Sequence, residues 1–247
     1  MQTAPEIIYK DADLIAINKP SGWLSIPDRH DAELYSVKSW FEAKGEKIFI
    51  VHRIDRDTSG LLLLARNAEA HKYYNTLFEQ RTLKKTYYGL VLGSVAEEQG
   101  VYDQPIEPHP TLLGKMRVGR KGKPAITHYT VEERFRGYTW VKFQIETGRT
   151  HQIRAHMKYL GHPLFNDIEY GGDQIVRGTN NTKYKQFIDN CFQLIPGQAL
   201  HAKTLGFIHP MTGERLFFDS ELPKGYQDIL TKWVNYTSNF YENNFTF

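Results

Sequence analysis

A run of charges that leads directly into an apolar segment constrains this chain more than any other feature. Residues 52–60 read HRIDRDTSG, and residues 61–65, which follow without a break, read LLLLA. Burying an ionised carboxylate costs several kcal/mol unless a nearby cation compensates it. The sequence therefore predicts that Asp55 sits in a cleft at the end of a core strand, with a cation beside it.

The composition is that of a globular protein. Of 247 residues, 40% are hydrophobic and 24% are charged, which excludes a largely disordered or fibrous chain. The net charge of only +3 does not identify a nucleic-acid binder, so local charge must carry that argument. The single cysteine, Cys191, excludes an internal disulfide and a cysteine-based zinc site and fits a reducing compartment. Without a signal peptide or an apolar run long enough for a bilayer, we expect a cytoplasmic protein with no membrane contact.

Strand patterns outnumber helix patterns, which favours an α+β fold. We expect one domain over residues 1–247, with its core at about 6–222 and a C-terminal helix and tail at 223–247. Asn67 is a good N-cap for a helix over residues 68–80, whose core-facing side chains would be Tyr73, Leu77 and Phe78. From Tyr236 onwards the chain is expected to be a frayed tail.

A basic segment stands out in the middle of the chain. No acidic residue lies between Glu107 and Glu132, and glycines 114, 119 and 122 punctuate this stretch. It is therefore predicted to be a hairpin or mobile loop whose cations contact phosphates. These cations are Lys115, Arg117, Arg120, Lys121 and Lys123.

Residues 52–60 resemble a signature of the RluA family of pseudouridine synthases, H-R-L-D-x-x-T-S-G, with Ile54 in place of leucine. In that family the aspartate is catalytic, and it corresponds to Asp55. The family arginine that fills the space left by a flipped base corresponds to Arg53. Taken alone, such a cluster would be interpreted as a salt-bridged turn at the start of a strand, but three further matches favour the family.

The first further match is residues 84–93, KKTYYGLVLG, which resemble the family strand K-x-Y-x-A-x-V-x-G. The family's active-site tyrosine corresponds to Tyr87. Its ring offers a face on which a flipped uracil can stack, worth about 1–3 kcal/mol per base by analogy with single-strand binders, and its hydroxyl can handle a proton. Tyr88 should point to the opposite face and is expected to be the better core residue.

The second match comprises residues 147–156, TGRTHQIRAH, and 161–164, GHPL. The family arginine that pairs with the catalytic aspartate corresponds to Arg154, which would keep Asp55 ionised and oriented. Arg149 is expected to contact phosphate or to close the loop. The third match comprises LHA at 200–202 and FIHP at 207–210, and with NKPSG at 18–22 the resemblance extends over about residues 6–222.

The resemblance implies a pseudouridine synthase catalytic fold of two halves, with a mixed, mostly antiparallel sheet and a central active-site cleft. Many relatives carry an RNA-binding domain before the first strand, and we expect that domain to be absent here. The reaction would isomerise uridine to pseudouridine within RNA after the base is flipped out, at a cost of a few kcal/mol. Asp55 could attack carbon 6 of the base or the anomeric carbon, or take a proton from the sugar. The partner would be ribosomal RNA, transfer RNA or both, bound by a monomer.

Two other functional classes share some of these sequence features. A non-catalytic RNA-binding protein would not need Asp55, Tyr87 and Arg154 together. A glycoside hydrolase needs two opposed carboxylates, and Asp57 lies awkwardly close to Asp55 for that role. No metal and no cofactor is expected, because His151 and His156 are five residues apart and the sequence lacks H-E-x-x-H and the glycine-rich nucleotide loops.

Overall fold

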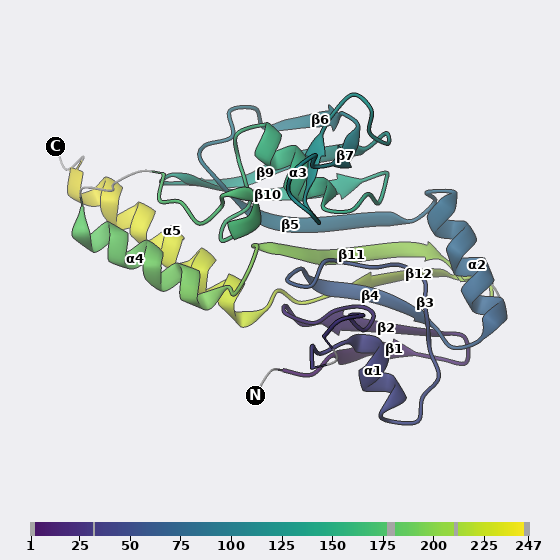
Figure 1. Cartoon of the computed structure of the whole chain (residues 1–247). Helices are drawn as coiled ribbons and strands as arrows, with labels where there is room; N and C mark the ends of the chain where they lie inside the picture. Colours follow the sequence, from purple (N-terminus) through teal and green to yellow (C-terminus); the bar gives the residue numbers. More distant parts are fainter. Residues whose placement is uncertain (1–2, 32, 177–180, 210–211, 245–247) are drawn as a thin grey trace. The chain divides into compact units, whose positions relative to one another are not determined.

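A computed structural model describes residues 3–31, 33–176, 181–209 and 212–244 of the chain. The chain forms two compact units, and Figure 1 shows their helices and strands. The first unit comprises Met1–Tyr87, Gln144–Thr147 and Leu200–Glu221, and the second comprises Tyr88–Phe143, Gly148–Ala199 and Leu222–Phe247. Both units combine strands with helices, which confirms the predicted α+β class.

The first unit is built on a mixed sheet that is mostly antiparallel, as predicted. Its main strand order is β1-β2-β4-β11, and two further strands lie off this path: β12 pairs with β11, and β3 pairs with β4. The β4–β11 pair is parallel, whereas the other pairs of this unit with a described register are antiparallel. The bounds of these strands are β1 Glu6–Lys10, β2 Leu14–Lys19, β3 Phe49–Ile50, β4 Ser59–Ala65, β11 Leu200–Ile208 and β12 Arg215–Asp219.

The apolar run of the sequence forms β4, which is buried along its whole length. Alternate residues on one of its faces, Leu62 and Leu64, pack in one cluster with Val37 and Phe41 of α1 (Val37–Glu42). Ser36 is the N-cap of α1, and its hydroxyl accepts a hydrogen bond from the Ser39 amide. The start of β4 is thereby fixed on a rigid core, directly after the charged turn.

Helix α2 (Ala68–Glu79) begins where the sequence predicts, because Asn67 caps it by accepting a bond from the Ala70 amide. Its predicted buried face is wrong. Ala70 and Tyr74, four residues apart on one side, are the buried residues of α2. The predicted residues Tyr73, Leu77 and Phe78 are only partly buried.

The strands of the second unit form two groups. β6 (Gln99–Asp103) pairs with one edge of β9 (Ile126–Phe135), and β10 (Tyr138–Ile145) pairs with the other. A separate antiparallel hairpin consists of β7 (Ile106–Pro108) and β8 (Met116–Val118). β5 (Lys84–Leu92) begins in the first unit and continues in the second after Tyr87.

Two long helices lie side by side in the second unit, α4 (Thr182–Leu194) and α5 (Lys224–Asn244) (Figure 1). Trp233 of α5 is fully buried, and its ring lies 4.8 Å from that of Tyr138. The predicted frayed tail is wrong at Tyr236, because α5 continues through this residue and its ring stacks on Phe187 at 4.9 Å. The shorter helices are α3 (Gln152–Tyr159) and the 3-10 helix η1 (Ile168–Tyr170).

Candidate active site

The turn that carries Asp55 is held through its backbone by the segment around residues 20–25. The Gly22 amide donates to the Arg56 carbonyl at 3.0 Å, and the Ser21 hydroxyl donates to the Asp57 carbonyl at 2.9 Å. The turn closes on itself where the Thr58 amide donates to the Asp55 carbonyl at 3.2 Å. Asp55 itself is half-buried, so the residue keeps some contact with solvent on a turn whose backbone is fixed.

Lys19 is the central anchor of this turn. Its side chain is fully buried, and its Nζ donates to the carbonyls of Pro20, Trp23 and Arg56 at 2.9, 2.7 and 2.8 Å. Burial lowers the pKa of Lys19 to about 7, and the charges of Asp57 and Asp55 oppose that shift. Three N–H donors meet three acceptors, so the ammonium form is fully satisfied.

The strings TSG and LHA, distant in the sequence, lie against each other in the parallel pair of β4 and β11. Ser59 is in register with His201, and Gly60 with Ala202. Gly60 has a φ of 106°, and a Cβ there would overlap the Ala202 carbonyl oxygen. The Ser59 hydroxyl lies 2.9 Å from His201 Nδ1 in a buried contact, and burial lowers the pKa of His201 to about 4. These residue types are therefore explained by packing beneath the Asp55 turn.

His52 also serves the structure. Its Nε2 accepts a hydrogen bond from the Leu63 amide at 3.0 Å, and its ring stacks on Phe78 with centroids 4.4 Å apart. Burial, with a smaller contribution from the charge of Lys85, lowers the pKa of His52 to about 3. The imidazole is therefore neutral at physiological pH and connects the turn to β4.

Tyr87 lies close enough to Asp55 for the two to interact electrostatically. Burial raises the pKa of the Tyr87 phenol, and the negative charge of Asp55 raises it further. Tyr87 is 9% exposed, whereas Tyr88 is only partly buried and stacks on Trp140 at 5.6 Å. The expectation that Tyr88 would be the more buried of the two is wrong, because the first half of β5 is covered on the Tyr87 side. A phenol held protonated beside a carboxylate can donate a hydrogen bond but is a poor base.

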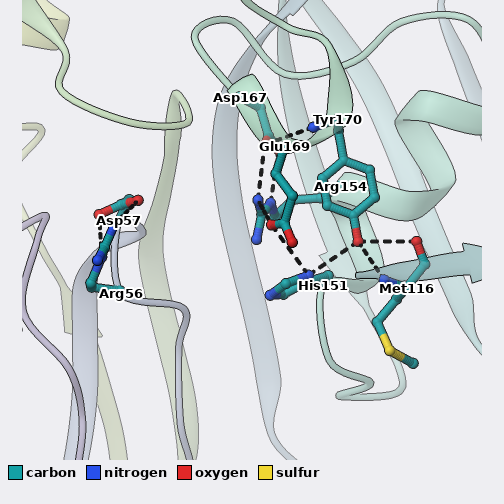
Figure 2. Close-up of polar contacts among 8 residues, drawn as sticks. All are labelled: Arg56, Asp57, Met116, His151, Arg154, Asp167, Glu169 and Tyr170. Carbon is teal, nitrogen blue, oxygen red and sulfur yellow. Dashed lines mark hydrogen bonds and ion pairs between the residues drawn. The ribbon is translucent and has the colours of Figure 1, made fainter. Parts of the chain in front are cut away.

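The other charges of the turn face outward. Arg53 and Arg56 are exposed, and Arg56 Nε pairs with Asp57 Oδ1 at 3.1 Å (Figure 2). Asp57 is thus engaged with its own neighbour in the chain. This contact gives it a structural partner and adds nothing to the two-carboxylate chemistry of a glycosidase.

In the second unit, Arg154 of α3 forms a network of ion pairs (Figure 2). Its Nε and Nη2 donate to the two carboxylate oxygens of Asp167 at 2.7 and 2.8 Å, and Nη2 also donates to Glu169 at 2.6 Å. Arg154 is 5% exposed and Asp167 is 1% exposed, so this bidentate pair is buried. Neither acidic partner was predicted from the sequence, where the available signal was an acidic residue three positions after the GHPL string. The pairing of Arg154 with Asp55 stays a prediction.

The basic segment 115–123 forms the end of the β7–β8 hairpin and the loop after it. Arg117 Nη2 pairs with Glu107 at 2.7 Å, so the argument that no acid neutralises these cations is wrong for Arg117. Gly119 and Gly122 are explained by close approach rather than by mobility, because a Cβ at these positions would overlap Glu107 or the Ile106 backbone. The exposed cations of the segment are Arg117, Arg120, Lys121 and Lys123.

Arg149 closes the loop before α3, one of its two expected roles. Its Nε donates to the Pro124 carbonyl at 3.0 Å, and its amide donates to the Gln152 side chain at 3.0 Å. Gln152 in turn donates to the Ile126 carbonyl at 2.9 Å. These contacts join the loop to the strand that follows the basic segment.

The histidines and the helices of the described residues bear on two other kinds of site, a metal centre and a membrane span. Within the described residues, no group of three or more histidine, cysteine or acidic side chains is placed to hold a metal ion. His156 instead lies between Thr127 Oγ1 and the Gln104 carbonyl, each at 2.9 Å. Among the helices of the described ranges, none is both long and apolar enough to span a bilayer.

Comparison with known proteins gives a consistent result. The family model described as RNA pseudouridylate synthase matches residues 13–159. The chain is 37% identical over 238 residues to "Uncharacterized RNA pseudouridine synthase YlyB" of Bacillus subtilis, covering 91% of the chain and 71% of that protein. It is 38% identical over 223 residues to "Ribosomal large subunit pseudouridine synthase D" of Vibrio parahaemolyticus, covering 88% and 67%. The solved structure titled "Human RNA Pseudouridylate Synthase Domain Containing 4" superposes with a TM-score of 0.72 at 25% identity, covering 93% of each chain.

Proposed function

Because the chain belongs to the RNA pseudouridylate synthase family, isomerases that act on RNA, we propose that Asp55 begins the isomerisation of a uridine in large-subunit ribosomal RNA. The RluA resemblance of the sequence is confirmed by the same relatives. Several of those relatives are named ribosomal large subunit pseudouridine synthase D, which supports ribosomal RNA over transfer RNA as the substrate.

The fixed turn around Asp55 is the observation that carries this proposal. Lys19, Ser21 and Gly22 bind the carbonyls of the two residues that directly follow Asp55, so the carboxylate needs little reorganisation before it reacts. The Asp55 side chain is not itself one of these anchors of the turn. Asp55 is half-buried, whereas Ser59 and His201 below it are fully buried.

The reaction needs no net oxidant, reductant or added group, because uridine and pseudouridine are isomers. The bond between N1 of uracil and C1′ of the ribose breaks, and a bond between C5 and C1′ forms. The proton on C5 is lost, and N1 gains one. Asp55 starts this sequence by attack on C6 or C1′ or by removing a sugar proton, and Tyr87 contributes a ring beside the base and a protonated hydroxyl.

Arg154 completes the proposed catalytic set on the basis of the motif resemblance. The guanidinium holds its charge against Asp167 and Glu169, which orient it within its own unit. We propose that Arg53 fills the space left by the flipped base. In this proposal Arg120, Lys121 and Lys123 contact phosphates, because they are exposed cations.

Asp55→Asn tests the proposal directly. The substitution removes one charge with almost no change in volume, and the backbone anchors of the turn remain. We expect tritium release from ribosomal RNA labelled at C5 of uridine to fall at least about 10³-fold, as for the loss of an essential group, while the melting temperature and RNA affinity stay close to wild type. Asp57→Asn is the matched control and should keep most of the activity.

The outcomes separate the competing functions. Release near the wild-type rate from Asp55→Asn would refute the assignment of Asp55. Wild-type protein that binds RNA but releases no tritium would indicate a non-catalytic RNA-binding protein. Release from transfer RNA but not from large-subunit RNA would replace the proposed substrate.

A further inference from the structure

Tyr170 connects the β7–β8 hairpin, which carries the basic segment and is called the basic hairpin below, to the remainder of the second unit. It ends η1, is 1% exposed, and lies with its hydroxyl at the backbone of Met116 in β8 (Figure 2). The Met116 amide donates to the hydroxyl oxygen at 2.9 Å, and the hydroxyl donates to the Met116 carbonyl at 3.0 Å. Met116 is a non-hydrogen-bonded position of the β7–β8 register, because the ladder bond next to it runs from the His109 amide to the Lys115 carbonyl, so the Met116 amide and carbonyl point away from β7. The hydroxyl therefore acts as a one-residue strand partner for β8.

The same hydroxyl reaches the start of α3. His151 Nδ1 lies 3.1 Å from it, and His151 precedes α3 with a left-handed φ of 52° and no side-chain capping bond. A phenol has one proton and two acceptor lone pairs. All three contacts are satisfied together when Tyr170 donates to Met116 and accepts from both the Met116 amide and a proton on His151 Nδ1. The hydroxyl thus joins β8 to the helix that carries Arg154.

The ring of Tyr170 contacts two cations with different proposed roles. Arg154 Cζ lies 4.7 Å from the ring centroid, and Lys115 Nζ lies 5.0 Å from it. Both distances are within the range of about 6 Å over which a cation is attracted to an aromatic face. The Tyr170 amide also donates to Asp167 Oδ1 at 3.3 Å, the same carboxylate that holds Arg154.

We infer that Tyr170 is a positioning residue that couples the hold of the basic hairpin on RNA to the placement of Arg154. This inference rests on the proposed function, since it assigns RNA to the hairpin. The hydroxyl fixes β8, and with it the start of the loop that carries Arg120, Lys121 and Lys123. The ring, together with Asp167, fixes the guanidinium. The two roles belong to different atoms of one side chain, so they can be separated by substitution.

Tyr170→Phe removes the hydroxyl and keeps the ring. We expect faster hydrogen exchange at the Met116 amide and a KM for RNA that is roughly 3- to 10-fold higher, the effect of about one lost hydrogen bond. The kcat at saturating RNA should stay within about 2-fold of wild type, since the ring still lies against Arg154. Tyr170→Leu also removes the ring, and kcat should then fall about 10-fold or more.

Tyr184→Phe is the matched control. Tyr184 is another buried tyrosine of the second unit, and its hydroxyl donates to the Arg136 carbonyl at 2.8 Å, away from the hairpin. This variant should lower the melting temperature to a similar extent but leave Met116 exchange and the KM unchanged. Equal changes in both phenylalanine variants would reduce Tyr170 to a general structural role and overturn the inference.

Other results would also overturn it. Unchanged Met116 exchange or an unchanged KM in Tyr170→Phe would remove the link to the hairpin, and an unchanged kcat in Tyr170→Leu would remove the link to Arg154. Wild-type protein without tritium release would refute the proposed function instead. The exchange at Met116 would still report on the hydroxyl contact in that case, so the two failures are distinguishable.

Discussion

In the first unit the turn around Asp55 is held through its backbone, whereas in the second unit Arg154 is held through its side chain. Carbonyls of the turn accept bonds from Lys19 and Ser21, and the Asp55 side chain is not needed for them. Arg154, by contrast, is positioned by the charges of Asp167 and Glu169. Backbone anchoring allows a reactive side chain to be replaced without loss of structure. When a side chain is held by ion pairs, as Arg154 is, any substitution that changes its charge also changes its position.

The largest expected effect tests the backbone-held region at Gly60. In Gly60→Ala, a left-handed φ of 106° and overlap with the Ala202 carbonyl act together, so β4 and β11 must separate. We expect a loss of about 4 kcal/mol or more in the free energy of unfolding, measured by denaturant titration. Gly45→Ala is the control, since Gly45 has a φ of 73° with open space around it and should lose about 1–2 kcal/mol. Equal losses would show that β11 does not constrain Gly60.

The next effect tests the side-chain-held region. Asp167→Asn removes one of the two carboxylates that pair with the buried guanidinium of Arg154 and leaves the pair with Glu169. We expect a loss of roughly 3 kcal/mol in the free energy of unfolding. This is at the lower end of the losses that follow when a buried ion pair is broken, because Glu169 still pairs with Arg154. The exposed pair of Arg56 and Asp57 provides the contrast, and Asp57→Asn should cost less than about 1 kcal/mol. A small loss in Asp167→Asn would mean that Glu169 alone positions Arg154.

The positions of strands and helices could be predicted from the sequence better than the contacts between distant residues. The apolar run and the Asn67 cap gave β4 and the start of α2, because these signals are local. The buried state of Lys19 could not be predicted, since lysine is normally exposed and its three acceptors are backbone carbonyls. Asp167 was missed for a related reason, because its partner lies 13 residues away and belongs to a different element.

Two kinds of residue in the site were ambiguous for physical reasons. A glycine in a basic segment can signal mobility or close approach, and only the structure shows Glu107 and Ile106 against Gly119 and Gly122. Alternation along β5 correctly places Tyr87 and Tyr88 on opposite faces, but it does not say which face is covered more deeply.

A third effect concerns the pH dependence of stability that arises from His201, a buried neutral histidine below the Asp55 turn. Folding lowers the pKa of His201 from its ordinary 6.5 to about 4, so between these values the unfolded chain binds more protons than the folded one. Stability from this residue is therefore present above pH 6.5 and is lost as the pH falls, by up to about 1.4 kcal/mol per pH unit. His201→Asn should be less stable at neutral pH but should lose stability less steeply on acidification. Parallel curves for the two proteins, from denaturant titrations between pH 7 and 4.5, would rule this out.

The smallest expected effect on stability, and the sharpest on binding, lies in the basic segment. Lys121 and Lys123 are exposed, whereas the guanidinium of Arg117 is already engaged by Glu107. If the exposed lysines contact phosphates, replacing both by alanine releases fewer counterions on binding, and the slope of log affinity against log salt should decrease by roughly 0.7–0.9 for each lost contact. Turnover at saturating RNA should be largely restored, because Asp55, Tyr87 and Arg154 are untouched.

Arg117→Ala should change the slope less, since the ion pair with Glu107 competes with phosphate for the same donors. Affinity measured at several salt concentrations distinguishes these variants. An unchanged slope in the double variant would make the segment a solvated basic surface, and an equal change in Arg117→Ala would show that RNA displaces Glu107.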